Sequence, residues 1–287
     1  MPLEAYQIWA DKLTTGFLAA DQFLRMEGFQ KLEFLPYRTQ LVPLAAAMVH
    51  LHERWLEPVI RTKLARWFWS GVFGELYGGA VETRIALDLH DLLAWIQDPD
   101  AQEPSTVIAA GFQPSRLDTL RTRTSAAYRG LYVLLQREGS KDFFWNARMT
   151  DLDQGEFNID IHHIFPRAWC RSRGIPDRVF NAIVNKTPIS YKANRTIGGK
   201  APSSYLAQLR EHPQVQISNA AQDDILRTHL IEPIHLHRDD FDNFYQARKR
   251  RLIELIERAM GKPVITISGE VPADDGEEDQ PGEDVAE

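Results

Sequence analysis

The chain has 287 residues, of which 44% are hydrophobic and seven are tryptophan, so it can form one large or two modest domains with a sizeable core. Its single cysteine, Cys170, excludes an intrachain disulfide and agrees with a reducing compartment. The N-terminus lacks the pattern of a signal peptide, and the most apolar run, residues 41–51, is too short to cross a bilayer. These features predict a soluble, cytoplasmic protein with no membrane partner.

The net charge of −7 is distributed unevenly along the chain. Residues 270–287 contain nine acidic residues and no basic ones, so residues 1–269 alone carry +2. Residues 156–211 contain nine Lys or Arg and four acids, a local charge of +5. Local positive charge favours a polyanionic partner. The plainer interpretation is an ordinary solvated surface, because Lys and Arg are usually exposed.

Helices are expected through most of the first half of the chain. Apolar side chains recur there at three- and four-residue steps, and this pattern predicts helices at residues 5–25, 58–77, 81–96 and 115–136. Gly78 and Gly79 are expected to end the second of them.

The character of the chain changes near residue 139, where short β-capable pieces replace the long apolar stripes. Residues 158–165 predict a strand that runs into a turn at Pro166, and residues 183–190 predict a second strand that Pro188 interrupts. Helices are expected again where Pro202 suits a first helical turn and apolar periodicity returns, at residues 203–211 and 220–260.

The fold class expected from these patterns is α+β overall, mostly α with a small β-containing insert. The predicted domains are a helical domain, a small core, C-terminal helices packing on the body and an acidic tail, at residues 1–138, 139–215, 216–262 and 263–287. The tail lacks aromatic residues and is expected to be disordered.

Two adjacent histidines, His162 and His163, lead into the apolar turn that ends at Pro166, and Asn185 and Asn194 follow downstream. A neutral imidazole, with an unperturbed pKa of about 6.5, suits a general base that activates water. A divalent metal stabilises the charge on phosphorus and on the leaving oxygen, and an Asn amide can ligate a cation or fix a loop. The set points to phosphodiester hydrolysis.

The histidine pair places a requirement on the strand. Adjacent residues of a regular strand point to opposite faces. The hypothesis therefore requires a break at the turn of residues 164–166, so that one imidazole binds metal while its neighbour faces the attacking water.

The segment of residues 159–206 resembles the His-Asn-His (HNH) nuclease motif, which has a ββα-metal fold, and in particular the C-terminal nuclease region of GmrSD-type modification-dependent restriction enzymes. The histidine pair before hydrophobic-x-Pro, the nine-residue spacing from Asn185 to Asn194 and the KxPSxYL-like residues 200–206 carry the likeness. The helical part looks like the region that precedes the motif in that family, so the likeness covers most of residues 15–255.

The resemblance implies a role for each motif residue. His163 would be the general base, and Asn185 would belong to the catalytic set as the residue that positions the base and the hairpin. His162 and Asn194 would hold one Mg²⁺ or Mn²⁺ ion. The insert at residues 139–215 would be the ββα-metal core of an endonuclease that acts on DNA, modified or foreign DNA included, in restriction and antiviral defence.

Three features depart from the family pattern. Many members have Asp or Glu where His162 stands, which shifts the metal preference, and Asn194 replaces the third histidine. The NTPase-like sensor region of GmrSD-type proteins is not found, since the P-loop pattern is absent from the sequence. The chain is therefore expected to be a stand-alone effector, one half of a split system or a fragment. For the last two, the expected partner is a sensor NTPase subunit or a missing N-terminal domain.

Basic residues near the motif are candidates for contacts with nucleic acid, namely Arg167, Lys192, Arg195 and Lys200. Lys200 follows two glycines that would let the backbone approach a phosphate, although such a run is more often a plain turn. Two other functions stay open: a catalytically inert module that binds nucleic acid or a partner, and a ribonuclease toxin.

Two further groups of titratable residues have plainer interpretations. His229, His235 and His237 form a second candidate metal cluster, in which His235 and His237 could share a strand face. A surface of scattered histidines is the plainer interpretation, because neither a cysteine nor a nearby carboxylate completes the set. Asp88 and Asp91 suggest paired carboxylates, but their spacing predicts the solvated face of the helix at residues 81–96.

The aromatic run and the basic run of the chain are ambiguous. Residues 67–69 (Trp-Phe-Trp) could stack on bases, but they are expected to be core, with Trp69 at its boundary. Residues 248–251 (Arg-Lys-Arg-Arg) would contact a nucleic-acid backbone or form the exposed face of the last helix.

Overall fold

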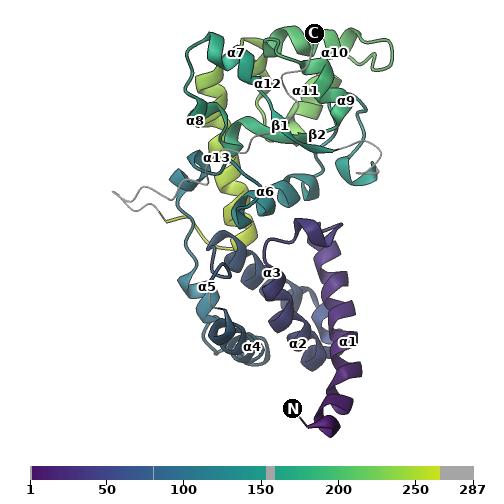
Figure 1. The fold of residues 1–287 in the computed structure, drawn as a ribbon, viewed down its shortest axis with the longest axis vertical. Coiled ribbons are helices and arrows are strands. Elements are labelled where there is room, and N and C mark those ends of the chain that lie inside the picture. The colour runs from purple at the N-terminus through teal and green to yellow at the C-terminus, as the bar shows by residue number, and fades with distance from the viewer. Residues whose placement is uncertain (1, 80, 153–158, 266–287) are drawn as a thin grey trace. The chain divides into compact units, whose positions relative to one another are not determined.

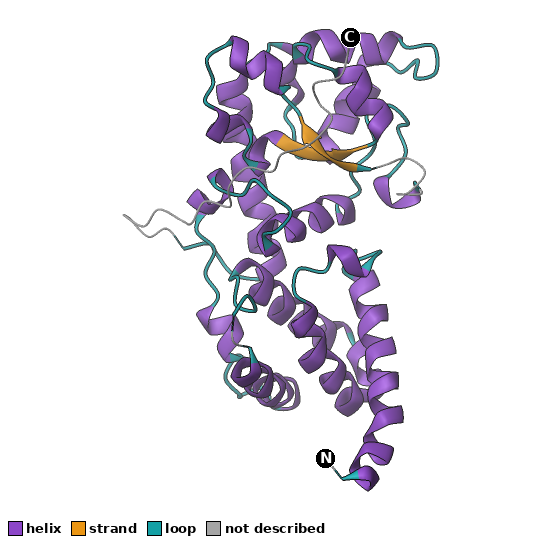
Figure 2. Cartoon of the chain, viewed as in Figure 1, coloured by secondary structure: helices purple, strands orange, loops and turns teal. Residues whose placement is uncertain are grey.

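The structure, a computed structural model, describes residues 2–79, 81–152 and 159–265 (Figure 1). These residues are mostly helical and contain one sheet of two antiparallel strands (Figure 2). The mostly α class is therefore confirmed. None of the helices in these ranges combines the length and apolarity that a bilayer crossing requires. The tail beyond residue 265, for which disorder is predicted, lies outside the described residues.

The chain divides into two compact units. The first comprises Met1–Phe112 and Ile256–Ile265, and the second contains Gln113–Leu255. The domain boundaries expected at residues 138, 215 and 262 stay predictions. Residues 113–138, which were expected to belong to the helical domain, are part of the unit that contains the sheet.

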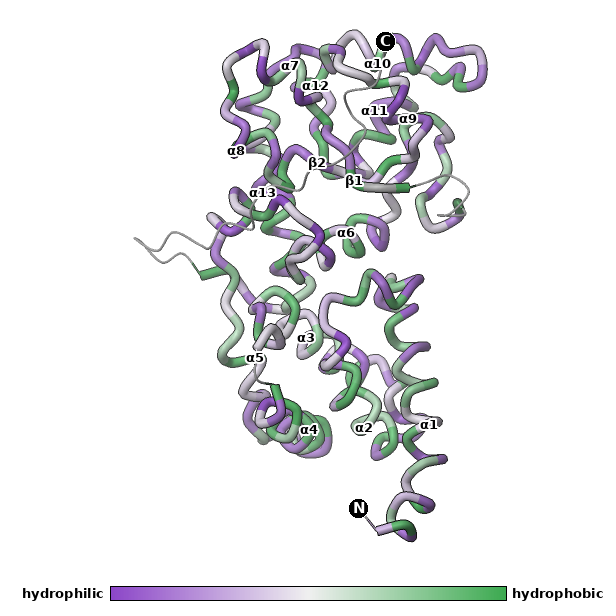
Figure 3. Tube along the Cα trace, viewed as in Figure 1, coloured by the Kyte–Doolittle hydropathy of each residue, from purple (hydrophilic) through white to green (hydrophobic). Residues whose placement is uncertain are grey.

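The first unit is helical throughout. Its elements are α1 (Leu3–Met26), η1 (Leu32–Phe34), η2 (Arg38–Gln40), α2 (Leu41–Leu51), η3 (His52–Leu56), α3 (Pro58–Phe73), α4 (Glu82–Gln97) and α5 (Ser105–Ala109), where η denotes a 3₁₀ helix. The mainly apolar α2 packs against α1 and α4 (Figure 3). At Gly16 the helices α1 and α2 come close together, since a Cβ there would lie 2.4 Å from the carbonyl oxygen of Ala45.

Three of the helices predicted from apolar periodicity are confirmed in this unit, as α1, α3 and α4. The second is shorter than expected, because α3 ends at Phe73 and Gly74 follows it, four residues before the glycine pair. Beyond this point Tyr77 is still buried and Leu76 is half-buried. The apolar pattern therefore continues past the residue where the helix ends.

The aromatic run at residues 67–69 is buried core, which leaves no ring available for bases. Trp67, Phe68 and Trp69 are all fully buried, so the expectation that Trp69 lies at the boundary is wrong. Its indole Nε1 donates to the Glu27 carboxylate at 2.7 Å, and this bond allows the polar edge of the ring to be buried.

Asp88 is fully buried on α4, although the sequence pattern predicts the solvated face. Its Oδ2 accepts hydrogen bonds from the Tyr77 hydroxyl and, at 2.8 Å, from Thr106 Oγ1. Burial is the main cause that raises the pKa of Asp88. These donors come from residues outside α4, and the helical pattern alone does not reveal them.

The second unit combines short helices with the sheet. Its elements are η4 (Pro114–Asp118), α6 (Ala126–Arg137), η5 (Met149–Asp151), β1 (Asp160–His163), α7 (Arg167–Ser172), α8 (Asp177–Phe180), η6 (Ile183–Asn185), β2 (Lys186–Ile189), α9 (Tyr191–Ile197), α10 (Pro202–Glu211), α11 (Asn219–Thr228), α12 (Pro233–His237) and α13 (Phe241–Met260). The single helix predicted at residues 115–136 is wrong in its first half. The Thr-rich residues 119–125 separate η4 from α6, in agreement with the low helix propensity of threonine.

The sheet is the antiparallel pair of β1 and β2. Its register places Asp160 opposite Ile189 and His163 opposite Lys186. Helix α6 packs against β2 (Figure 1). Helix α9 starts directly after Ser190, whose Oγ caps it by accepting the Ala193 amide at 3.2 Å. Both predicted strands are confirmed in shortened form.

Candidate functional site

The two histidines lie next to each other in a strand that is regular through His163. His162 pairs with Thr187 and His163 with Lys186, so the expected break at residues 164–166 follows both of them. The imidazoles therefore leave opposite faces of the strand. His163 is 4% exposed and His162 is half-buried. The structure does not place both on one face, and this separation sets different surroundings for each.

His163 contacts an asparagine that the sequence analysis missed. Its Nε2 lies 3.0 Å from Oδ1 of Asn181, which is also buried. An amide oxygen accepts only, so with this assignment of the amide Nε2 carries the proton and the lone pair is on Nδ1. Asn181 directly follows α8. No spacing rule distinguished it from the other asparagines, so the sequence held no specific sign of this contact.

Asn185 fastens the turn after β1 to the start of β2. It is fully buried, its Oδ1 accepts the Phe165 amide at 2.9 Å, and its Nδ2 donates to the carbonyls of Phe165 at 2.9 Å and Phe180 at 3.0 Å. Its own carbonyl accepts the Ile164 amide at 2.8 Å. This geometry agrees with the positioning role expected for Asn185. Its part in catalysis stays a prediction.

Two distant side chains hold the same backbone from further along the chain. The Tyr205 hydroxyl donates to the Ile164 carbonyl at 2.9 Å. Arg248, 1% exposed, donates through Nη1 to the carbonyls of Val184 at 2.6 Å and Lys186 at 2.7 Å. Burial lowers the pKa of Arg248 to about 9. Arg248 therefore fits neither interpretation of the basic run, since it is a buried structural cation.

His229 bonds the middle of β2, and Asp142 bonds the residue that follows this strand. His229 is fully buried, with Nδ1 2.7 Å from Thr187 Oγ1 and Nε2 2.6 Å from the Lys141 carbonyl. Burial is the main cause that lowers the pKa of His229 to about 3. The Asp142 carboxylate accepts the Ser190 amide at 2.6 Å. His229 is thus a neutral core residue with both ring nitrogens engaged.

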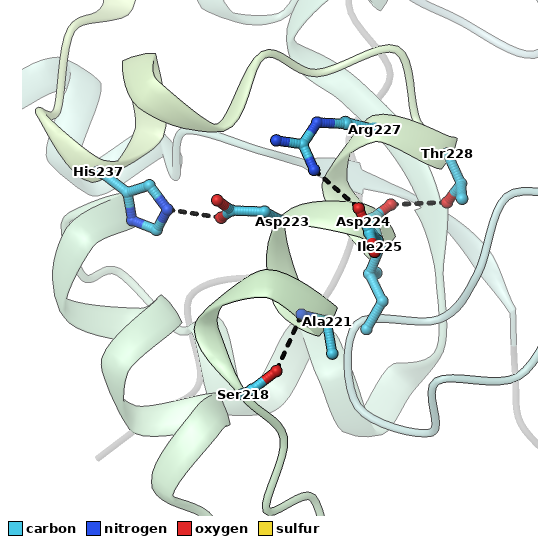
Figure 4. A network of polar contacts seen from close by, with 8 residues as sticks. All are labelled: Ser218, Ala221, Asp223, Asp224, Ile225, Arg227, Thr228 and His237. Atoms are coloured by element: carbon cyan, nitrogen blue, oxygen red, sulfur yellow. Dashed lines mark hydrogen bonds and ion pairs between the residues drawn. The ribbon is translucent and has the colours of Figure 1, made fainter.

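The other two histidines of the alternative cluster lie on α12 and not on a strand. His237 Nε2 lies 2.7 Å from Asp223 Oδ1 on α11 (Figure 4). Residues two apart on a helix point in different directions, so His235 and His237 do not share a face. Within the described ranges no group of three His, Cys, Asp or Glu side chains could hold a metal ion.

The two expected metal ligands come from the strand pair and from the helix that follows it. His162 lies in β1, and the half-buried Asn194 lies on α9. One imidazole nitrogen and one amide oxygen are neutral donors that many divalent ions accept. Imidazole suits ions such as Zn²⁺, Ni²⁺ or Fe²⁺ better than Mg²⁺, whereas an amide oxygen suits Mg²⁺ and Mn²⁺. That this pair holds an ion stays a prediction.

The four basic residues expected at nucleic acid lie on two helices of the second unit, α7 and α9, and on the loop before α10. Arg167 begins α7 and is half-buried, whereas Lys192 and Arg195 are exposed on α9, three residues apart and so on one side of it. Lys192 Nζ lies 5.2 Å from the ring centroid of Phe144. The exposed Lys200 contacts the Gln208 side chain. Their contact with nucleic acid stays a prediction.

Because His229 is buried and neutral, the free energy of unfolding is expected to decrease as the pH is lowered. Between pH 6.5 and about 3 the unfolded histidine binds a proton that the folded one does not, so stability is complete above pH 6.5 and is lost as the pH falls. At pH 5 the loss is expected to be about 2 kcal/mol relative to pH 7.5. Urea unfolding of the wild type and of His229→Gln at both pH values measures it. Equal pH dependence in the two proteins would contradict the assignment.

Comparisons with known proteins give one relative and no function. No family model matches the chain. Over 220 residues it is 26% identical to the uncharacterized protein MJ0686 of Methanocaldococcus jannaschii, a match that covers 68% of this chain and 36% of that protein. The chain thus spans about a third of the length of this relative, whose name states no activity.

Proposed function

We propose that this chain is a metal-dependent endonuclease of the HNH type that hydrolyses phosphodiester bonds of DNA, as the effector part of a restriction or antiviral defence system. The order β1, β2, α9, with His163 at the end of the first strand, Asn185 before the second and Asn194 on the helix, supports it. That order is the one expected of a ββα-metal core. A sensor NTPase, in another chain or domain, is the partner that this proposal implies.

The observation that carries the proposal is the set of buried polar side chains around His163. Asn181 bonds the imidazole, and Asn185, Tyr205 and Arg248 bond the backbone on both sides of the hairpin. Burying polar groups destabilises the folded state unless each of them has a hydrogen-bond partner. A catalytic base needs such a second layer of contacts, because small displacements lower the rate strongly.

The proposed mechanism assigns separate work to the two histidines. Asn181 keeps the proton of His163 on Nε2, so that Nδ1 accepts the proton of the attacking water. Asn185 keeps the turn after β1 in place, which fixes the position of that imidazole. His162 and Asn194 would hold the divalent ion, and when bound the ion supplies positive charge to the phosphate and to the leaving oxygen.

Cleavage assays test the proposal directly. Purified protein is expected to cut duplex DNA, unmodified or modified, with Mg²⁺ or Mn²⁺, to stop when EDTA removes the metal, and to resume when metal is added in excess. The products are resolved on denaturing gels, with single-stranded RNA as a parallel substrate. Failure to cut any DNA with either ion would overturn the proposal. Faster cleavage of RNA would favour a ribonuclease, and salt-sensitive binding without cleavage would favour an inert binding module.

A further inference from the structure

Four arginines lie in a segment that runs from η4 through the following loop to the first turn of α6. This segment precedes the histidine motif in the sequence. Residues 113–129 contain these arginines, Arg116, Arg121, Arg123 and Arg129, and one acid, Asp118. The Asp118 carboxylate accepts from Lys249 Nζ at 2.5 Å and from the Tyr245 hydroxyl at 2.9 Å. Asp118 thus bonds α13. Of the four arginines, Arg123 is exposed, Arg116 and Arg129 are half-buried, and Arg121 is 7% exposed. We call residues 116–129 the arginine loop.

The arginine loop is folded back on itself by its own side chains. Arg116 Nη1 donates to Thr119 Oγ1 at 2.9 Å, and its Nη2 lies 3.4 Å from Ser125 Oγ. Ser125 is the residue before the first turn of α6, the turn that carries the half-buried Arg129. Arg123 lies between them and is exposed. The bonds of Arg116 therefore bring the two ends of the loop together.

The arginine loop is bonded to the hairpin that contains His163. The Ile183 amide donates to the Leu120 carbonyl at 2.8 Å, and Lys186 Nζ donates to the Arg121 carbonyl at 3.0 Å. Lys186 is the register partner of His163 in the sheet. The Lys186 side chain therefore connects the arginine loop to the strand position opposite the proposed base, His163.

The chemistry of the arginine loop suits the phosphates of a nucleic-acid backbone. The guanidinium fork matches phosphate oxygens in pairs of hydrogen bonds, and a hydroxyl such as that of the exposed Thr124 is a frequent phosphate donor. We propose that the arginine loop binds the phosphates next to the one that is hydrolysed. The inference rests on the proposed nuclease function, and it names a surface other than Arg167, Lys192, Arg195 and Lys200.

Salt-dependent DNA binding tests the inference separately from cleavage. The full chain in EDTA is titrated with a labelled DNA duplex by fluorescence anisotropy at several salt concentrations. Because each phosphate contact adds about −0.9 to the slope of log K against log salt, Arg123→Ala/Arg129→Ala is expected to make the slope shallower by about two. Affinity should fall equally for unrelated sequences. Arg123→Ala alone changes an exposed side chain and should remove about one unit.

The matched control removes the same charge elsewhere. Arg54→Ala/Arg227→Ala alters two exposed arginines that are ion-paired with Glu57 and Asp224, and its slope should equal that of the wild type. If wild type cuts DNA but the Arg123 and Arg129 variants keep its slope, the inference is wrong and the nuclease function stands. If wild type neither binds nor cuts DNA, both are wrong. Arg123→Lys/Arg129→Lys should restore the slope, because lysine keeps the charge.

Discussion

Replacing His163 by alanine is expected to slow DNA cleavage by about 10²–10⁴-fold, the usual contribution of a positioned general base. The affinity for the divalent ion should change little. The loss of rate follows from the arrangement at the end of β1. There Nε2 of the buried imidazole faces Asn181 Oδ1, which leaves the lone pair of Nδ1 to accept the proton of the water. Single-turnover cleavage rates at saturating metal measure the first effect, and calorimetric titration with Mn²⁺ measures the second.

The same experiment on the proposed ligands should give the opposite pattern. His162→Ala and Asn194→Ala are expected to weaken metal binding, and higher metal concentrations should restore part of the cleavage rate. His90→Ala is the matched control, because the side chain of His90 is 83% exposed in the first unit, and it should behave as wild type. Equal metal binding by the variants at 162, 163 and 194 would refute these roles.

The strand explains why the two histidines are not interchangeable. Adjacent positions of β1 point to opposite faces, and only the face of His163 carries the contact with Asn181. The proposed ligand, His162, and the proposed base, His163, therefore have different neighbours. If the roles were exchanged, His162 would need a neighbour that orients its imidazole as Asn181 orients that of His163.

The parts of the fold that the sequence predicts are those whose interacting residues lie close together along the chain. The helices α1 and α4 follow from apolar residues three and four positions apart, a pattern within one element. The strand pair follows from two short β-capable runs. The predicted helix over residues 115–136 failed at residues 119–125, where Leu120 alone is apolar and threonine and arginine form a loop.

The contacts that hold the candidate site could not be predicted in this way. His229 reaches Thr187 across 42 residues and Lys141 across 88, and Arg248 reaches Val184 across 64. From the local sequence each of these polar residues, like Asp88, is expected at the surface. Only the fold brings it to its buried partner. The motif predicts roles for His163 and Asn185, whereas the contact of Asn181 with His163 is evident only from the structure.

Asn185→Ala is expected to destabilise the protein by about 3 kcal/mol or more, the largest effect on stability among these predictions. Three hydrogen bonds are lost, and the Phe165 amide with the carbonyls of Phe165 and Phe180 becomes buried without this partner. Each net hydrogen bond contributes about 0.5–1.5 kcal/mol, and each unsatisfied buried group adds a penalty of about 1–3 kcal/mol. Urea unfolding at pH 7.5 measures the loss.

A surface asparagine provides the control for this change. Asn243 is exposed and donates through Nδ2 to Asp240 at 2.7 Å, so Asn243→Ala should cost no more than about 0.5 kcal/mol. Cleavage by the folded fraction of Asn185→Ala, measured well below its unfolding midpoint, should also be slow, because the turn that fixes His163 has lost its bonds. An Asn185→Ala protein with wild-type stability would show that the turn is held by Tyr205 and Arg248 alone. Wild-type stability with slow cleavage would instead mean that Asn185 acts on the base and not on the fold.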